Sequence, residues 1–224
     1  MTQTHTTQRV GHHIQPARYH LRKGEIELFI AVDKNQVTGS HAPSNEANHR
    51  GLKALGHTLV TVLLPYGDYA RLTPEMTDIM TRRGNKMRRL DLAGSISTVI
   101  DRKANISELA QNLCSTAEEH ERFHTEYTLA RQCGSRFFLL VEDDHIRSID
   151  DVEQWENPRR KRWEHWKELE SKGYTLKHPL PKRPPVDGRA LAKALRTIEE
   201  RYGVKTYFCT PQQAPSAIEY LLTH

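Results

Sequence analysis

The chain has few cysteines and no long apolar run. Its three cysteines, Cys114, Cys133 and Cys209, are far apart and form no CxxC pair, so the sequence predicts neither a zinc knuckle nor a disulfide framework and favours a reducing compartment. No stretch approaches the roughly 20 apolar residues of a membrane helix. The polar N-terminus also lacks the apolar core of a signal peptide. We therefore expect a soluble, cytoplasmic protein that makes no contact with a membrane.

Glycine-rich phosphate-binding motifs are missing as well. No GxxxxGK[ST] occurs and no GxGxxG follows a predicted strand, which argues against nucleotide hydrolysis and dinucleotide chemistry. What the chain does have is positive charge, with 33 Lys and Arg against 28 Asp and Glu and a net charge of +5. The cations cluster at residues 82–89 (RRGNKMRR) and 159–162 (RRKR). Such clusters are typical of proteins that bind a polyanion.

Hydrophobic patterning predicts strands that alternate with helices, and so an α/β fold. A length of 224 residues favours one domain with insertions, and the polar residues 1–24 have the composition of a flexible arm. The expected strands are 26–32, 58–64, 97–101, 136–142 and 204–209. The expected helices are 44–55 with Ser44 as N-cap, one from residue 107, 117–132, 189–202 and 214–222. Two insertions are expected, a polar basic loop over the site at 77–94 and a charged helical segment at about 148–187, anchored by Trp155, Trp163 and Trp166.

Two short acidic motifs carry the chemistry. Asp68 follows Gly67 in a turn, whereas Asp101 and Lys103 are separated by one residue in a predicted strand. Because strand side chains alternate with period two, Asp101 and Lys103 face the same pocket, which Asp68 joins from an earlier strand end. Two carboxylates can hold Mg²⁺ beside a phosphate, while an ammonium group orients water or offsets phosphate charge. The pattern thus predicts a metal-dependent phosphodiesterase.

The order of these motifs resembles the nuclease domain of XPF-type structure-specific endonucleases. The matching segments run through most of the chain from about residue 26: LPYGDY at 64–69, LTPEM at 72–76, DRK at 101–103, SEL at 107–109, RF at 122–123, FFLLVE at 137–142 and GRAL at 188–191. Small prokaryotic and phage-borne members are the most similar at the C-terminal end. The resemblance implies a restriction-endonuclease-like mixed sheet flanked by helices, in a bacterial or phage-infected cell.

The resemblance also implies a set of catalytic residues, namely Asp33, Asp68, Asp101 and Lys103. The three aspartates would bind Mg²⁺ or Mn²⁺, with Asp33 as a ligand or a supporting carboxylate, and Lys103 would position or help to deprotonate the attacking water. The chain departs from the family at Asn35 and Gln36, where an arginine and a glutamate are usual, and at Asp101, where glutamate is more common.

Glu108 and Glu142 are further acids near the predicted site. For Glu108 we favour a helix-dipole role, whereas Glu142 is a metal ligand or a structural group.

DNA is the expected partner, in branched or flapped form, within repair, recombination or phage DNA processing. No tandem helix-hairpin-helix module follows in this sequence, so DNA binding is expected from this domain or from a partner, and a homodimer is plausible from the resemblance. The predicted phosphate-binding residues are Arg82, Arg83, Lys86, Arg88, Arg89, Arg102 and Arg122, and the 159–162 cluster is expected to add contacts. The alternative is a catalytically weak module that binds DNA junctions for a partner.

A third interpretation rests on His120 to His124, which match the HExxH pattern of zinc peptidases. On a helix the two imidazoles would lie one turn apart, with Glu121 as base and Glu142 as a possible third ligand. The central Arg122 is a cation, however, and the neighbouring Glu118, Glu119 and Glu126 suggest a solvent-facing helix. We therefore favour a chance match.

Overall fold

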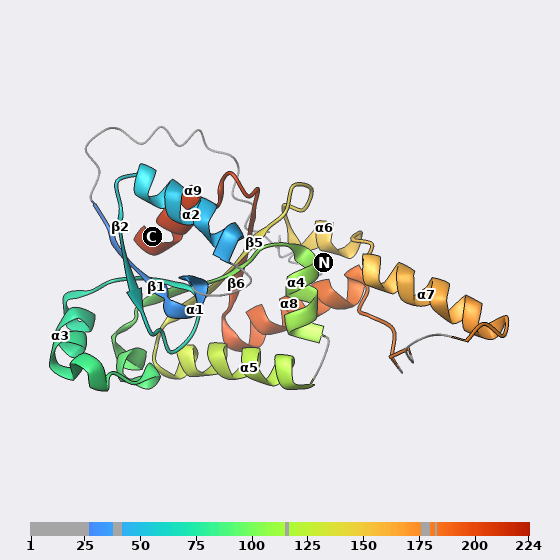
Figure 1. Ribbon diagram of the computed structural model, residues 1–224, viewed down its shortest axis with the longest axis horizontal. Helices are drawn as coiled ribbons and strands as arrows, with labels where there is room; N and C mark the ends of the chain where they lie inside the picture. Colours follow the sequence, from blue (N-terminus) through green and yellow to red (C-terminus); the bar gives the residue numbers. More distant parts are fainter. Residues whose placement is uncertain (1–26, 38–41, 115–116, 176–179, 182) are drawn as a thin grey trace, which may run out of the picture.

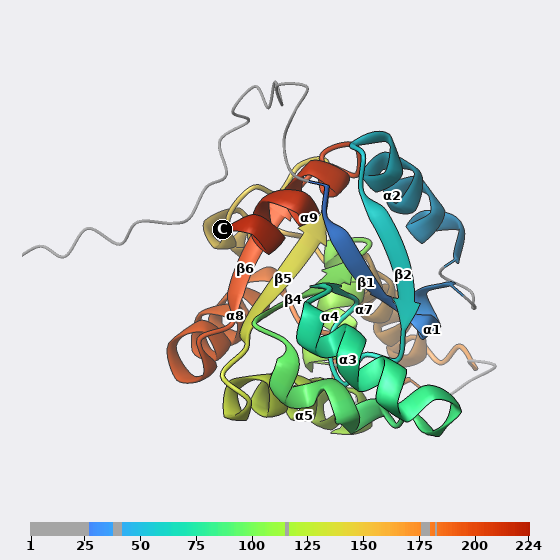
Figure 2. The same cartoon turned by 90° about the vertical axis from the view of Figure 1, so that its left-hand side faces the viewer.

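The computed structural model describes residues 27–37, 42–114, 117–175, 180–181 and 183–224. Its centre is a mixed six-stranded sheet in the order β2-β1-β3-β4-β5-β6, with helices packed on both faces (Figures 1 and 2). Only β3 runs antiparallel to its neighbours β1 and β4; the pairs β1–β2, β4–β5 and β5–β6 are parallel. The predicted α/β class, a mixed sheet flanked by helices, is confirmed. The predicted arm at 1–24 lies outside the described residues.

The elements have the following bounds. The strands are β1 (Phe29–Asp33), β2 (Thr58–Val62), β3 (Tyr69–Arg71), β4 (Thr98–Lys103), β5 (Arg136–Glu142) and β6 (Lys205–Cys209). The α-helices are α1 (Lys34–Val37), α2 (Ala42–Ala54), α3 (Pro74–Arg83), α4 (Ile106–Cys114), α5 (Ala117–Gln132), α6 (Ile149–Glu153), α7 (Pro158–Ser171), α8 (Gly188–Tyr202) and α9 (Ala214–Thr223). Two 3₁₀ helices, η1 (Gly84–Lys86) and η2 (Arg89–Ser95), follow α3.

The core has two layers because strand side chains point alternately to opposite faces of the sheet. On one face Val99 and Leu139 pack with apolar residues of α4, α5 and α8. On the other, Ile100 and Leu140 pack with residues of α2 and α9. Both faces are therefore covered, so that a polar side chain on a central strand is buried whichever way it points.

Sequence patterning located most elements correctly. Helix α5 and strand β5 have the predicted bounds, and Phe123, Tyr127 and Ala130 share the buried face of α5 as expected. Helix α2 begins at Ala42, so the prediction that Ser44 caps it is wrong. Among the described residues, no helix combines the length and hydropathy needed to cross a bilayer.

One of the two predicted insertions differs from expectation, whereas the helical character of the segment from residue 148 is confirmed. The segment 77–94 is helical and not a loop, because Thr73 caps α3 through a hydrogen bond from the Met76 N–H and Leu92 of η2 is fully buried in the core. Between residues 148 and 172 the chain forms two helices, α6 and α7. Trp155 packs against the core, but Trp166 is 41% exposed, so its predicted role as an anchor is wrong.

Candidate active site

The candidate site lies at the carboxyl edge of the sheet, where β1 and β4 end and β3 begins. Asp101 and Lys103 leave β4 on the same face, and the Lys103 Nζ lies 2.8 Å from Asp101 Oδ1. This confirms that the two side chains share one pocket. Both are almost fully buried, and the Lys103 ammonium group also stands over the Phe123 ring, 5.2 Å from its centroid. The pair is thus a fixed charged group on the wall of a cavity of about 660 Å³.

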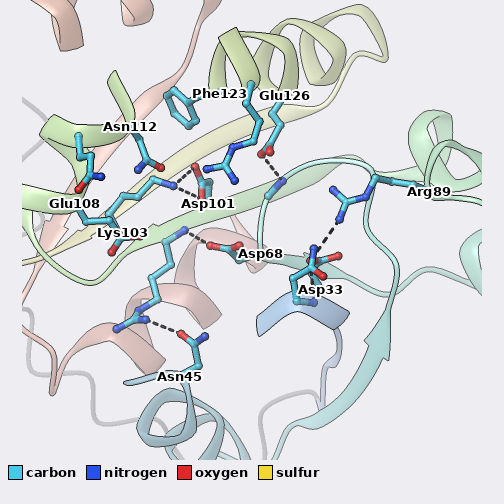
Figure 3. Close-up of a pocket in the computed structure, with 15 residues that line it drawn as sticks. Asp33, Asn45, Asp68, Arg89, Asp101, Lys103, Glu108, Asn112, Phe123 and Glu126 are labelled. Atoms are coloured by element: carbon cyan, nitrogen blue, oxygen red, sulfur yellow. Dashed lines mark hydrogen bonds and ion pairs between the residues drawn. The ribbon is translucent and has the colours of Figure 1, made fainter. Parts of the chain in front are cut away.

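Asp68 reaches the same cavity through the turn before β3. Gly67 has φ +66°, and a Cβ there would lie 2.4 Å from Val99 Cγ2, so the turn requires glycine at this position. The Asp68 N–H donates to the Ile100 carbonyl at 2.8 Å, and the Asp68 carbonyl accepts from the Asp33 N–H at 2.9 Å. The backbone of Asp68 is therefore held between β1 and β4, and its side chain lies beside Asp101 and Lys103 (Figure 3).

The pKa values of Asp68 and Lys103 are both raised, for different reasons. The pKa of Asp68 lies well above its usual range because the carboxyl is buried and faces the Asp101 carboxylate, although Lys103 and the Arg102 N–H partly oppose this. Burial lowers the pKa of Lys103, but Asp101 and Asp68 outweigh it and raise the pKa overall. Lys103 consequently keeps its proton at neutral pH. An ammonium group cannot accept a proton, so Lys103 fits the predicted positioning role and not the role of a base.

Asp33 lines the cavity with a different set of partners. One oxygen, Oδ1, accepts from the Leu64 N–H at 2.9 Å, and Oδ2 accepts from the Asn35 N–H at 3.1 Å. The Arg89 guanidinium group is 3.8 Å from Oδ2. In Figure 3 Asp33 faces Arg89 and not the Asp101–Lys103 pair. Of its two predicted roles, the partners of Asp33 favour that of a supporting carboxylate.

Arg102 does not have the surface position that the predicted phosphate contact requires. Because it alternates with Asp101 and Lys103, it points to the α2 side of the sheet, where it is only 7% exposed. Its Nε and Nη2 pair with the two carboxylate oxygens of Glu142, the second at 2.7 Å, and its Nη1 donates to Asn45 Oδ1 at 2.6 Å. Glu142 is thus a structural group. Arg102 lines the cavity, but its burial and its pairing with Glu142 do not favour the predicted contact with DNA.

Glu126 is the site residue that sequence reasoning missed. It was grouped with solvent-facing acids, yet it lies one turn after Arg122 on the wall that α5 gives to the cavity. Its Oε2 accepts from the Gly67 N–H at 3.5 Å. Burial and the nearby Asp101 raise the pKa of its carboxyl group. The helical spacing of Arg122, Phe123 and Glu126 is the signal that would have placed all three on one face. The side chains of Glu118 and Glu119 are outside the described set.

Cations form the rim of the cavity. Arg89 begins η2 and Arg122 comes from α5, and both line the opening. The remaining predicted contacts on α3 and the 3₁₀ helices, Arg82, Arg83, Lys86 and Arg88, are all exposed. Glu108 also lines the cavity, but its Oε2 accepts from the Ala104 N–H at 2.9 Å, in agreement with a role at the helix start. Arg89 and Arg122 thus place two positive charges on the lining of the cavity.

The carboxylate pair fits a divalent cation. Asp101 Oδ2 is buried, lies 2.8 Å from the Lys103 ammonium group and has no further hydrogen-bond partner among the described residues, and burial together with the nearby Asp101 carboxylate raises the pKa of Asp68. A cation bound between the two carboxylates would give Asp101 Oδ2 a further partner and would offset the negative charge that raises the pKa of Asp68. Across the described ranges, no three His, Cys, Asp or Glu side chains are grouped around a common metal position. Mg²⁺ commonly binds through one or two carboxylates and retains waters, so two carboxylates suffice.

The HExxH interpretation gains no support. The rings of His120 and His124 stack with centroids 6.1 Å apart, and His124 Nε2 lies 2.9 Å from the Tyr202 hydroxyl oxygen. Glu142, the possible third ligand, pairs with Arg102 on the α2 side of the sheet. Within the described part of the chain these residues belong to no metal-binding group.

Comparison of the chain with protein-family models and with curated proteins finds no match. The XPF-type resemblance of the motifs therefore remains a prediction. What can be said of the site comes from its own geometry.

Proposed function

We propose that this protein is a metal-dependent endonuclease that hydrolyses phosphodiester bonds in DNA. The observation that carries the proposal is the convergence of Asp68, Asp101 and Lys103 on one cavity whose rim holds Arg89 and Arg122. Carboxylates inside and cations around the opening suit a phosphodiester that is bound at the rim and cleaved within. The XPF-type resemblance supports the same reaction.

Each residue of the site has a role in this reaction. Asp68 and Asp101 would hold Mg²⁺ or Mn²⁺, which supplies Lewis-acid stabilisation and a more acidic water when bound. Lys103 keeps its proton through its ion pair with Asp101, so its charge is available to the phosphate as negative charge builds on the equatorial oxygens. Asp33 keeps Arg89 near the opening. Glu126 holds the Gly67 turn that carries Asp68.

The substrate we propose is branched or flapped DNA, in repair, recombination or phage DNA processing. The exposed cations of α3 and the 3₁₀ helices extend the positive rim beyond the cavity, which favours contact with several phosphates of one duplex. Binding through phosphates releases counterions, so affinity should fall steeply with salt. The choice of a branched over a linear substrate rests on the resemblance of the motifs.

A second candidate is a DNA-junction-binding module with weak catalysis. It is favoured by the partners of Asp33, whose two oxygens accept backbone hydrogen bonds, and by Asn35, which lines the cavity where the family resemblance places an arginine. The same rim would then serve binding alone.

The test is a comparison of labelled flap, fork and linear duplex DNA, incubated with the wild-type protein in Mg²⁺, in Mn²⁺ and with a chelator. Under the nuclease proposal, metal-dependent products appear and the chelator abolishes them, while binding persists. Tight fork binding without cleavage in either metal would favour the binding module. A protein that neither binds nor cuts any of these substrates would exclude both functions.

A further inference from the structure

Helix α7 stands apart from the rest of the molecule. It spans 14 residues, or roughly 21 Å at 1.5 Å per residue, and none of them is buried. Figure 1 shows it projecting from the body beyond α6, α4 and α8. Helices of globular proteins usually gain their stability by packing an apolar face. Helix α7 therefore has most of its surface available to a binding partner.

The root of this helix is fixed to the body. Asn157 caps α7, and its Nδ2 donates to the Val186 carbonyl at 2.7 Å. Arg160 Nη1 lies 3.2 Å from Asp187 Oδ2. At Gly188, the first residue of α8, a Cβ would lie 2.3 Å from the Val152 carbonyl oxygen, so the start of α8 packs closely against α6. The helix consequently projects in a defined direction.

The charges of α7 are placed against its own dipole. Its first turn contains no acid but holds the cluster Arg159 to Arg162, although the positive end of a helix dipole disfavours cations. Arg160 and Lys161 have carboxylate partners, Glu164 and Glu156 respectively. Within the described ranges Arg159 and Arg162 have no ion pair, and both are exposed. Cations without an ion pair at the positive end of a helix are unfavourable for folding, and departures of this kind are typical of functional sites.

These two cations share a face with an aromatic side chain. Arg159, Arg162 and Trp166 occur at i, i+3 and i+7, which places them along one side of a helix. The Trp166 side chain is 41% exposed, whereas Trp163 donates its indole N–H to the Pro181 carbonyl at 3.0 Å. One stripe of α7 thus offers two exposed guanidinium groups and an exposed indole.

The position of α7 relative to the cavity suggests which partner this stripe meets. The cavity extends from Arg89 at the start of η2 to Gln111 and Asn112 of α4. Helix α4 packs against α8, whose N-cap Asp187 pairs with Arg160 at the root of α7. Helix α3 with its exposed cations lies at the other end of the molecule, as Figures 1 and 2 agree. Basic elements therefore lie at both ends of the molecule, with α4 between them (Figure 1).

We propose that α7 is a second DNA-contacting element, in which Arg159 and Arg162 bind phosphates of the duplex arm that extends past α4. This inference rests on the proposed function, because it assigns a path to the DNA that the cavity would cut. The duplex would lie across the cavity, with α3 and the 3₁₀ helices on one side and α7 on the other. The α7 contact increases the affinity of the protein for DNA and fixes the direction of the duplex, and it does not involve the reacting phosphate.

The test compares Arg159→Gln/Arg162→Gln with Lys167→Gln/Lys172→Gln. Both double variants remove two cations from α7 and its C-cap, but Lys167 and Lys172 are paired with Glu170 and Glu168. Binding to a labelled fork is measured by fluorescence anisotropy over a range of salt concentrations with a chelator present. Each lost phosphate contact lowers the salt slope by about 0.9. We expect the arginine variant to lose about 1.8 of slope and roughly tenfold in affinity, and the lysine variant to match the wild type.

The outcomes separate this inference from the proposed function. Removing cations from the first turn relieves the helix dipole, so the arginine variant should keep its helix, and Arg159→Glu/Arg162→Glu should show a larger loss. Equal slopes for all variants, with the wild type still cutting the fork in Mg²⁺, would overturn the α7 contact alone. A wild type that neither binds nor cuts would overturn the α7 contact and the nuclease together.

Discussion

Arg102 and Glu142 form a buried two-point ion pair that joins β4 to β5 directly behind the candidate catalytic residues. The same Glu142 accepts a hydrogen bond from Asn48 Nδ2 at 2.8 Å, and Arg102 donates to Asn45. Burial lowers the pKa of Arg102, but the Glu142 carboxylate outweighs this and raises it. Helix α2 is thereby tied to the strand that carries Asp101 and Lys103.

Breaking this pair should destabilise the fold. Glu142→Gln leaves the Arg102 charge buried without its carboxylate, and such losses cost about 3 to 5 kcal/mol. Urea unfolding of the variant measures the change. The control is Glu168→Gln, which removes the exposed partner of Lys172 and should cost less than about 1 kcal/mol. Equal effects of the two variants would contradict the structural role given to Glu142.

Gly67 should tolerate no side chain. Gly67→Ala places a Cβ against Val99 at a positive φ, which combines backbone strain with overpacking. Gly134→Ala is the matched control, because Gly134 has φ +75° and a Cβ there would meet nothing within 4 Å. We expect Gly67→Ala to lower the free energy of unfolding by about 1 to 3 kcal/mol more than the control does. Similar losses would mean that Val99 gives way at no cost.

Asp68 should weaken the metal-free fold at neutral pH. Its pKa is raised by burial and by Asp101, so the folded state binds the proton more tightly than the unfolded state and loses stability as pH rises from the ordinary Asp pKa to the raised one. Asp68→Asn removes that loss. In chelator, thermal unfolding should show the variant to be more stable than the wild type at neutral pH, with the gap closing in acid. A gap independent of pH would contradict the electrostatic cause.

Removal of the Glu126 side chain should lower the cleavage rate more than removal of the side chain of its exposed neighbour Glu121. Glu126→Ala removes the acceptor for the Gly67 N–H and loosens the turn that carries Asp68, and small misplacements of reacting groups are costly. We expect a loss of cleavage rate on the order of tenfold, with DNA binding unchanged. Glu121→Ala serves as the control, because that side chain lies outside the main cavity. Equal rates for the two variants would exclude this role for Glu126.

The sequence predicted the local features of the site because they depend on short spacings. An acid and a lysine two residues apart on a strand must share a face, and a glycine before Asp68 is the turn residue that the close approach to Val99 requires. Strand β5 has the predicted bounds because the apolar run RFFLLVE has the length of a buried strand and is too short for a typical buried helix.

The features that the sequence did not predict depend on what covers each face. Arg102 was assigned to DNA because its neighbours are catalytic candidates, but α2 covers the face to which it points and offers Asn45. The several acids of α5 are typical of a solvent-facing helix, so the sequence predicts that Glu126 is exposed, although its spacing from Arg122 places both on one face. In the segment 77–94 the many cations are typical of a loop, and the sequence pattern does not reveal that Leu92 is buried.

The most direct measurement compares cleavage of a labelled flap by the wild type, Asp101→Asn and Lys103→Met in Mg²⁺, with Glu200→Gln on the exposed face of α8 as control. Removal of a group that stabilises the transition state typically costs about 10² to 10³ in rate. We predict losses of that size for the two site variants, with fork binding retained, and wild-type cleavage by the control. Cleavage that persists in both site variants would contradict the assignment of Asp101 and Lys103 to catalysis.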